Sequence, residues 1–63
     1  MTARERARLM RIARANAREY ALRRQQATLC VMRGEGVTEE TRRGLTFHVQ
    51  AVAEAMALLV GTE

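Results

Sequence analysis

A chain of 63 residues forms at most one small domain, and this one has a single cysteine and no visible metal-ligand cluster to stabilise it. The formal net charge is +4, but the basic excess lies in residues 1–24, which carry eight Arg against two Glu, whereas residues 25–63 carry three Arg against five Glu. No stretch approaches 18 consecutive apolar residues, which excludes a membrane-spanning helix.

The first predicted element is a helix over about residues 3–33. The segment contains no proline and is rich in Ala, Arg, Leu and Gln, which favour helices. Thr2, followed three residues later by Glu5, has the spacing of a capping box at its start. Apolar residues fall on one face of this helix, which we expect to be its contact face. They are Met10, Ala13, Ala17, Tyr20, Ala21, Ala27, Thr28 and Val31, with Leu9 at the edge.

The opposite side of the first helix is basic. Arg4, Arg8 and Arg11 recur at i, i+4 and i+7, Arg18 shares their side, and Arg14 lies at its edge. Such a row is typical of nucleic-acid binding, because each Arg–phosphate contact releases counterions. The alternative is a solvated face that keeps a small oligomer soluble. The residues expected to contact RNA, DNA or an acidic protein are Arg4, Arg8, Arg11, Arg14 and Arg18.

Residues 34–37 are predicted to form the turn. Gly34 and Gly36 flank Glu35, and a glycine just past a helix end can adopt the left-handed conformation that closes the last helical turn.

A turn centred on Glu35 also predicts a register between the two helices. Opposed residue numbers then sum to about 71, which brings Ala13 near Leu59 and Tyr20 near Val52. The first ten or so residues of the first helix would extend about 15 Å beyond the second helix. The sequence therefore predicts an uncovered, arginine-rich N-terminal arm.

The second predicted helix covers about residues 38–60. Thr38 is the expected N-cap, and Glu39 and Glu40 follow where the helix dipole favours negative charge. Gly44 is a weak point inside the helix, costing about 1 kcal/mol relative to Ala, or a place of close helix approach. Apolar residues form a first row at four-three spacing and a second row on the other side. The first row is Leu45, Val49, Val52, Met56 and Leu59, and the second row is Phe47, Ala51 and Leu58.

A helix that is apolar over more than half its circumference needs more than one neighbour. One neighbour is the first helix, and the other must come from another chain. The predicted fold is therefore all-α: a single helical-hairpin domain over residues 1–63 that forms an antiparallel homodimer, hence a four-helix bundle. The expected oligomer-interface residues are Leu45, Val49, Val52, Met56, Leu59, Phe47 and Leu58.

His48 and Cys30 are the only residues of their types, and neither belongs to a catalytic or metal-binding pattern. The register places His48 closest to Arg24, so we expect a structural or interfacial histidine. Cys30 is expected to be a buried thiol, with a disulfide across the dimer axis as the alternative. No phosphate-binding loop or positioned carboxylate pair is present. We therefore expect no enzyme activity, catalytic residue, cofactor, metal or small-molecule substrate.

In chain length and outline, the predicted hairpin resembles the Rop-type helical hairpins, which dimerise into four-helix bundles and bind RNA. The resemblance is one of architecture, and it transfers no functional residues. The single cysteine, without a signal-like segment, favours a cytoplasmic location. The sequence predicts a non-enzymatic regulatory or adaptor protein that contacts an anionic partner through its Arg-rich helix. The alternative is a protein–protein interaction module that docks a partner through Phe47, Ala51 and Leu58, without a nucleic-acid role.

Overall fold

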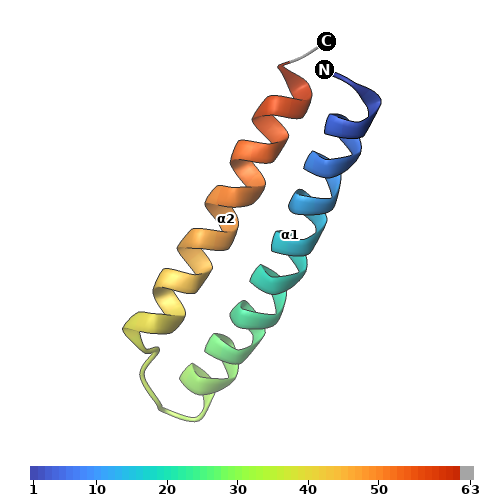
Figure 1. The fold of residues 1–63 in the computed structure, drawn as a ribbon. Coiled ribbons are helices and arrows are strands. Elements are labelled where there is room, and N and C mark those ends of the chain that lie inside the picture. Colours follow the sequence, from blue (N-terminus) through green and yellow to red (C-terminus); the bar gives the residue numbers. More distant parts are fainter. Residues whose placement is uncertain (62–63) are drawn as a thin grey trace.

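A computed structural model of the chain describes residues 1–61 as two antiparallel helices, α1 (Ala3–Met32) and α2 (Glu39–Val60), packed against each other (Figure 1). No strand occurs among these residues. Neither helix has a segment long and apolar enough to cross a membrane. The prediction of an all-α helical hairpin is therefore confirmed. The last two residues of the predicted 1–63 domain lie outside the described residues.

Both helices begin after a threonine cap, as the sequence predicts. The Thr2 side chain accepts a hydrogen bond from the Glu5 backbone N–H at 3.1 Å, and Thr38 accepts one from Thr41 N–H at 3.2 Å. Each bond satisfies one of the N–H groups that a helix start leaves without an intrahelical partner. Local sequence therefore determines where both helices start.

Helix α1 ends in a Schellman turn at Gly34. The φ angle of Gly34 is +79°, a left-handed conformation that glycine adopts without a Cβ clash. Its N–H donates to the Val31 carbonyl at 3.0 Å, and the Glu35 N–H donates to the Cys30 carbonyl at 2.9 Å. These two bonds satisfy carbonyl groups of the last helical turn. The predicted left-handed glycine at this helix end is confirmed.

The connection places α2 nearer to the N-terminus of α1 than the sequence predicted. His48 pairs with Asn16 instead of Arg24, and Gly44 lies against Arg23. These residue numbers sum to 64 and 67, below the expected value of about 71. Figure 1 shows the cause: the chain leaves α1, bends beyond its end and runs back before α2 begins.

The predicted N-terminal overhang of about ten residues is therefore wrong. Arg6 lines the same groove as Leu59 and Val60, so the end of α2 reaches almost to the start of α1. Figure 1 shows the two ends of the hairpin close together. Ala13 and Leu59, which were expected to be neighbours, do line this one groove.

The seam between the helices consists mainly of small and polar side chains. Within the described residues only Ala13, Ala55 and Leu59 are buried. The half-buried and buried positions recur at the four-three spacing of packed helices. On α1 they are Leu9, Ala13, Asn16, Tyr20, Arg23, Ala27 and Cys30, and on α2 they are Thr41, Gly44, Leu45, His48, Ala51, Val52, Ala55 and Leu59.

The predicted contact face of α1 is therefore only partly correct. Met10, Ala17 and Val31 are exposed, whereas Asn16 and Arg23 occupy the seam. The physical reason is that small side chains and a cross-helix hydrogen bond allow closer packing here than the larger apolar residues would. A prediction based on hydrophobicity alone therefore places the apolar side of α1 against α2, instead of the face that carries Asn16 and Arg23.

Candidate functional site

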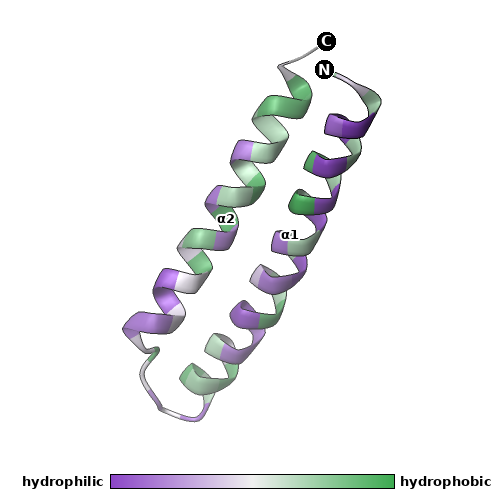
Figure 2. Cartoon of the chain, in the orientation of Figure 1, coloured by the Kyte–Doolittle hydropathy of each residue, from purple (hydrophilic) through white to green (hydrophobic). Residues whose placement is uncertain are grey.

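The large apolar side chains lie mostly outside the seam. Figure 2 shows α2 to be mostly hydrophobic beyond its first turns, while hydrophilic residues dominate the N-terminal half of α1. No side chain of the described residues is fully buried. The predicted interface residues divide into two sets: Leu45, Val52 and Leu59 face α1, whereas Val49, Met56, Phe47 and Leu58 are exposed.

One flank of the hairpin is hollowed by a groove of about 310 Å³ between the helices. Helix periodicity identifies further residues on this flank, because positions at i±4 and i±7 share a side of a helix. Val49 precedes Met56 by seven residues, and Ala17 follows Met10 by seven. We define the groove face as the exposed apolar residues Met10, Ala17, Ala21, Val49, Met56 and Val60. The groove itself is lined by Arg6, Met10, Ala13, Arg14, Met56, Leu59 and Val60.

The opposite flank presents Phe47 and Leu58, and by the same periodicity Glu54 lies between them on α2. The Phe47 ring packs edge-on to the His48 ring, with 5.2 Å between the ring centroids. On α1 this side carries Ile12, which lines a shallow pocket together with Glu5, Arg8 and Leu9. We define the Phe47 flank as Ile12, Phe47, Ala51 and Leu58.

The arginines predicted to bind an anionic partner lie outside the seam. Arg4, Arg11 and Arg18 recur every seven residues, so they form a row with steps of about 10.5 Å along α1. Arg8 lies beside this row, and Arg14 connects it to the groove. All are exposed, and within residues 1–61 none of their side chains has a hydrogen bond or ion pair. We define the arginine face as Arg4, Arg8, Arg11, Arg14 and Arg18.

The ion pairs of the described residues involve other arginines. Glu35 lies 3.2 Å from Arg33, and Glu39 lies 3.5 Å from Arg43. Both pairs are well exposed, so each contributes little to stability. Neither ion pair involves a residue of the arginine face.

A polar pair that the sequence did not reveal crosses the seam. The Asn16 amide nitrogen donates to the Ile12 carbonyl at 2.9 Å, so its Oδ1 faces the His48 Nδ1 at 2.7 Å. Because this oxygen only accepts, Nδ1 must carry the hydrogen, and a neutral ring keeps its lone pair on Nε2. The pair favours one alignment of the helices, as a polar residue in a helix–helix seam does. The prediction that Arg24 lies closest to His48 is therefore wrong.

A second unexpected contact joins Arg23 to Gly44. A Cβ atom at Gly44 would lie 2.9 Å from the Arg23 Nη1, so the glycine leaves room for the guanidinium across α2. The Arg23 Nε is buried without a hydrogen-bond partner. Glu19 Oε2 lies 3.9 Å from it, close enough for charge attraction but too far for a hydrogen bond. The glycine inside the predicted helix was the only signal of this close approach.

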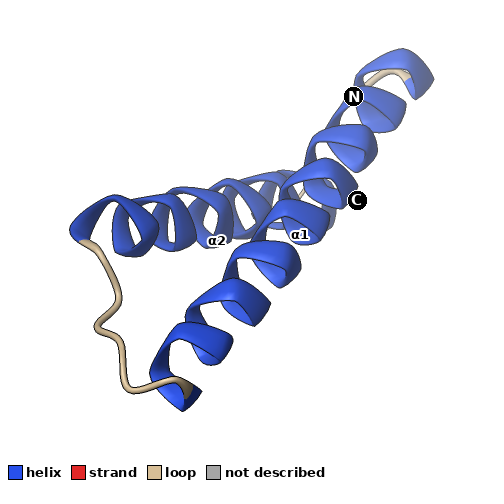
Figure 3. Ribbon diagram, turned by 90° about the horizontal axis from the view of Figure 1, so that it is seen from below, coloured by secondary structure: helices blue, strands red, loops and turns tan. Residues whose placement is uncertain are grey.

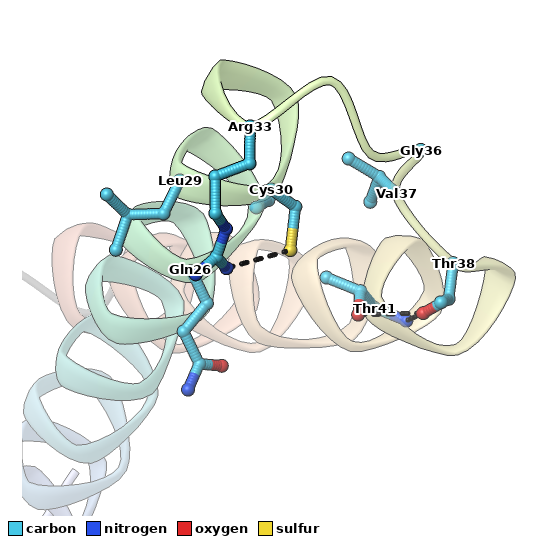
Figure 4. A pocket seen from close by; sticks show the side chains of 9 residues that line it. Gln26, Leu29, Cys30, Arg33, Gly36, Val37, Thr38 and Thr41 are labelled. Atoms are coloured by element: carbon cyan, nitrogen blue, oxygen red, sulfur yellow. Dashed lines mark hydrogen bonds between the residues drawn. The ribbon is translucent and has the colours of Figure 1, made fainter.

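At the loop end the helices diverge (Figure 3) and leave a cavity of about 430 Å³. Cys30 and Arg33 line it on one side, and Thr38 and Thr41 line it on the other (Figure 4). The Arg33 Nη2 lies 3.9 Å from the Cys30 Sγ. Cys30 is half-buried, less than the buried thiol that was predicted. Within residues 1–61, no group of three or more His, Cys, Asp or Glu side chains is placed to hold a metal ion.

Comparison of the chain with models of protein families, with curated proteins and with solved structures gives no match. The function must therefore be inferred from the chemistry of the arginine face, the groove face and the Phe47 flank.

Proposed function

We propose that the chain is a non-enzymatic regulatory or adaptor protein that forms a homodimeric four-helix bundle and binds nucleic acid through the arginine face. The observation that carries the binding function is the arginine face itself. Its guanidinium groups are exposed and lack side-chain partners within the described residues. Like charges at i, i+4 spacing repel, which costs a few tenths of a kcal/mol per pair in an isolated helix. A polyanion bound along α1 would reverse that cost.

The linear arrangement of the arginines favours nucleic acid over an acidic protein. Arg4, Arg11 and Arg18 span about 21 Å along the helix. Duplex DNA carries one negative charge per roughly 1.7 Å of its axis, so a row of this length meets several phosphates whatever the base sequence. A protein partner would have to position its carboxylates one by one. The arginine face is therefore better suited to a phosphate backbone.

The packing of the hairpin supports the homodimer. Most large apolar side chains of α2 are exposed, and the seam holds only three buried residues in the described part of the chain. Hydrophobic burial is the dominant favourable contribution to folding, and a 63-residue chain without disulfides has little other means of support. Folding and association should therefore be a single step, with a melting temperature that rises with protein concentration. A concentration-independent melt with a monomer mass by light scattering would contradict the dimer.

The binding function is tested by removing charge at two places. The triple change Arg4→Gln, Arg8→Gln and Arg11→Gln acts on the arginine face. The matched control, Arg33→Gln, Arg42→Gln and Arg43→Gln, removes the same charge elsewhere. Fluorescence anisotropy with duplex and single-stranded oligonucleotides, at about 50 to 200 mM salt, measures the affinity.

We expect the first triple variant to bind more weakly and the control to retain most of its affinity. The slope of log affinity against log salt should fall by up to about 0.9 for each phosphate of duplex DNA that the variant no longer neutralises. Equal losses of affinity in both variants would mean that the protein binds nucleic acid through its overall positive charge and not through the arginine face in particular. If the unmodified protein does not bind at about 50 mM salt, nucleic acid is excluded and an acidic protein becomes the candidate partner.

A second candidate function rests on the Phe47 flank. Phe47 is 65% exposed and Leu58 is 54% exposed, and a group of exposed large apolar side chains on one flank is typical of a protein-docking surface. Docking through these residues would make the chain a protein-interaction module without a nucleic-acid role. Such binding would depend little on salt, whereas binding through the arginine face weakens steeply as salt rises.

A further inference from the structure

We propose that the second copy of the chain covers the groove face, leaving Arg4, Arg8, Arg11 and Arg18 of the arginine face and the Phe47 flank exposed. The inference rests on the proposed homodimer and adds which of the two flanks forms its interface.

The exposed area is sufficient for one such interface. The chain exposes 5210 Å². A compact monomer of 7.1 kDa would expose roughly 4,100 Å², so the hairpin has an excess of roughly 1,100 Å². A stable interface of standard size removes about 800 Å² from each partner. Covering one flank therefore accounts for most of the excess, and covering both is unnecessary.

The shape and chemistry of the groove face suit a second copy. On α2, Val49, Met56 and Val60 form an apolar row at i, i+7 and i+11. On α1, Ala17 and Ala21 lie beside it, and such small side chains allow another helix to approach closely. The groove at the end of this row can accept a large side chain from the partner. By helix periodicity, no carboxylate of residues 1–61 falls on this face.

The Phe47 flank is a poorer dimer interface because it contains charge. Glu54 lies between Phe47 and Leu58, and Arg8 and Glu5 adjoin Ile12. Burying such groups without ideal partners costs several kcal/mol for each ion. On the groove face the charged residues are arginines, and two of them, Arg6 and Arg14, line the groove itself. Their aliphatic stems can cover apolar surface while their charged ends stay in water.

The groove-face dimer also agrees with the proposed binding function. A partner on the Phe47 flank would cover Arg8, which lines the same shallow pocket as Ile12. A partner on the groove face covers Arg14, which lines the groove, and leaves Arg4, Arg8, Arg11 and Arg18 in solvent. A two-fold symmetric dimer uses the same patch on both copies, so this one face is sufficient for closure.

Two matched double variants test the choice of face. Val49→Glu with Met56→Glu places two charges on the groove face, where the native side chains are 46% and 47% exposed. Phe47→Glu with Leu58→Glu places two charges on the other flank. In the single chain Phe47 and Leu58 are more exposed than Val49 and Met56. Sedimentation equilibrium or light scattering over a concentration series gives the dimer dissociation constant. We expect the first variant to raise this constant by about 100-fold or more, and the second to leave the dimer intact.

A separate measurement keeps the test decisive if a variant fails to fold. In a Cys30→Ser background, Met56→Cys and Leu58→Cys each introduce one thiol for alkylation under native conditions. We expect alkylation at position 56 to be at least about tenfold slower than at position 58 under conditions where the dimer forms.

The outcomes separate this inference from the homodimer on which it rests. A dimer that survives the Val49 and Met56 changes but dissociates with the Phe47 and Leu58 changes would overturn the groove face and preserve the dimer. Slower alkylation at position 58 than at position 56 would have the same meaning. A monomeric unmodified protein would instead overturn the homodimer itself.

Discussion

The seam between α1 and α2 is mainly small and polar, whereas the groove face is entirely apolar at its defining positions. Across the seam, Asn16 and His48 share a hydrogen bond, and most of the other positions are small or polar residues such as Ala13, Arg23 and Gly44. On the groove face, Val49 and Met56 are large and apolar, yet nearly half of each side chain faces solvent. The hairpin thus places its polar cross-helix contact inside and most of its large apolar side chains outside.

This difference indicates a division of roles. A cross-helix hydrogen bond contributes only about 1 kcal/mol net, but leaving one partner unsatisfied is costly, so it selects one register more than it stabilises the fold. Burial of a large apolar side chain contributes about 1.5–3 kcal/mol. The seam therefore aligns the helices, whereas most of the large apolar side chains of the single hairpin remain exposed to solvent.

The largest expected effect tests the outside of the molecule. Met56→Ala should lower the free energy of unfolding by about 2–5 kcal/mol per site, because in the proposed dimer a second copy covers this side chain and the truncation leaves a cavity. Gln50→Ala, at an exposed polar position of α2, should change it by less than about 0.5 kcal/mol. Chemical denaturation at fixed protein concentration measures both. If the two substitutions are equally mild, Met56 is not covered in solution and the contrast with the seam fails.

A smaller effect is expected inside the seam. Asn16→Ala should cost about 1–3 kcal/mol, because the His48 Nδ1–H loses its acceptor in a partly buried position. A double-mutant cycle with His48→Ala isolates the pair from the effect of each truncation. Additive losses in the cycle would show that the hydrogen bond does not connect the helices in solution.

The smallest effect concerns the close approach of Arg23 to Gly44. Gly44→Ala should gain up to about 1 kcal/mol of helix propensity, but in the unmodified protein the new methyl group must displace the Arg23 guanidinium. In an Arg23→Ala background the obstacle is gone, so the same substitution should stabilise α2 more. Thermal melts of the four proteins at one concentration compare the two backgrounds. An identical change in both would mean that Arg23 does not lie over Gly44.

Local interactions explain what the sequence by itself determined. Thr2 and Thr38 cap helices within three residues of themselves, and Gly34 supplies a backbone conformation that other residues rarely adopt. The exposure of the arginine face also follows locally, because a row of like charges without carboxylates cannot be buried. These features depend on neighbours along the chain, so they could be read without knowing how the helices pack.

The alignment of the helices was decided only by tertiary structure. Asn16 and His48 lie 32 positions apart, and nothing in the pattern of apolar residues marks them as partners. Several faces of α2 are apolar enough to be buried, so hydrophobicity alone does not select which one meets α1. The selection depends on the fit of small side chains, on the room above Gly44 and on one cross-helix hydrogen bond, all of which exist only when both helices are in place.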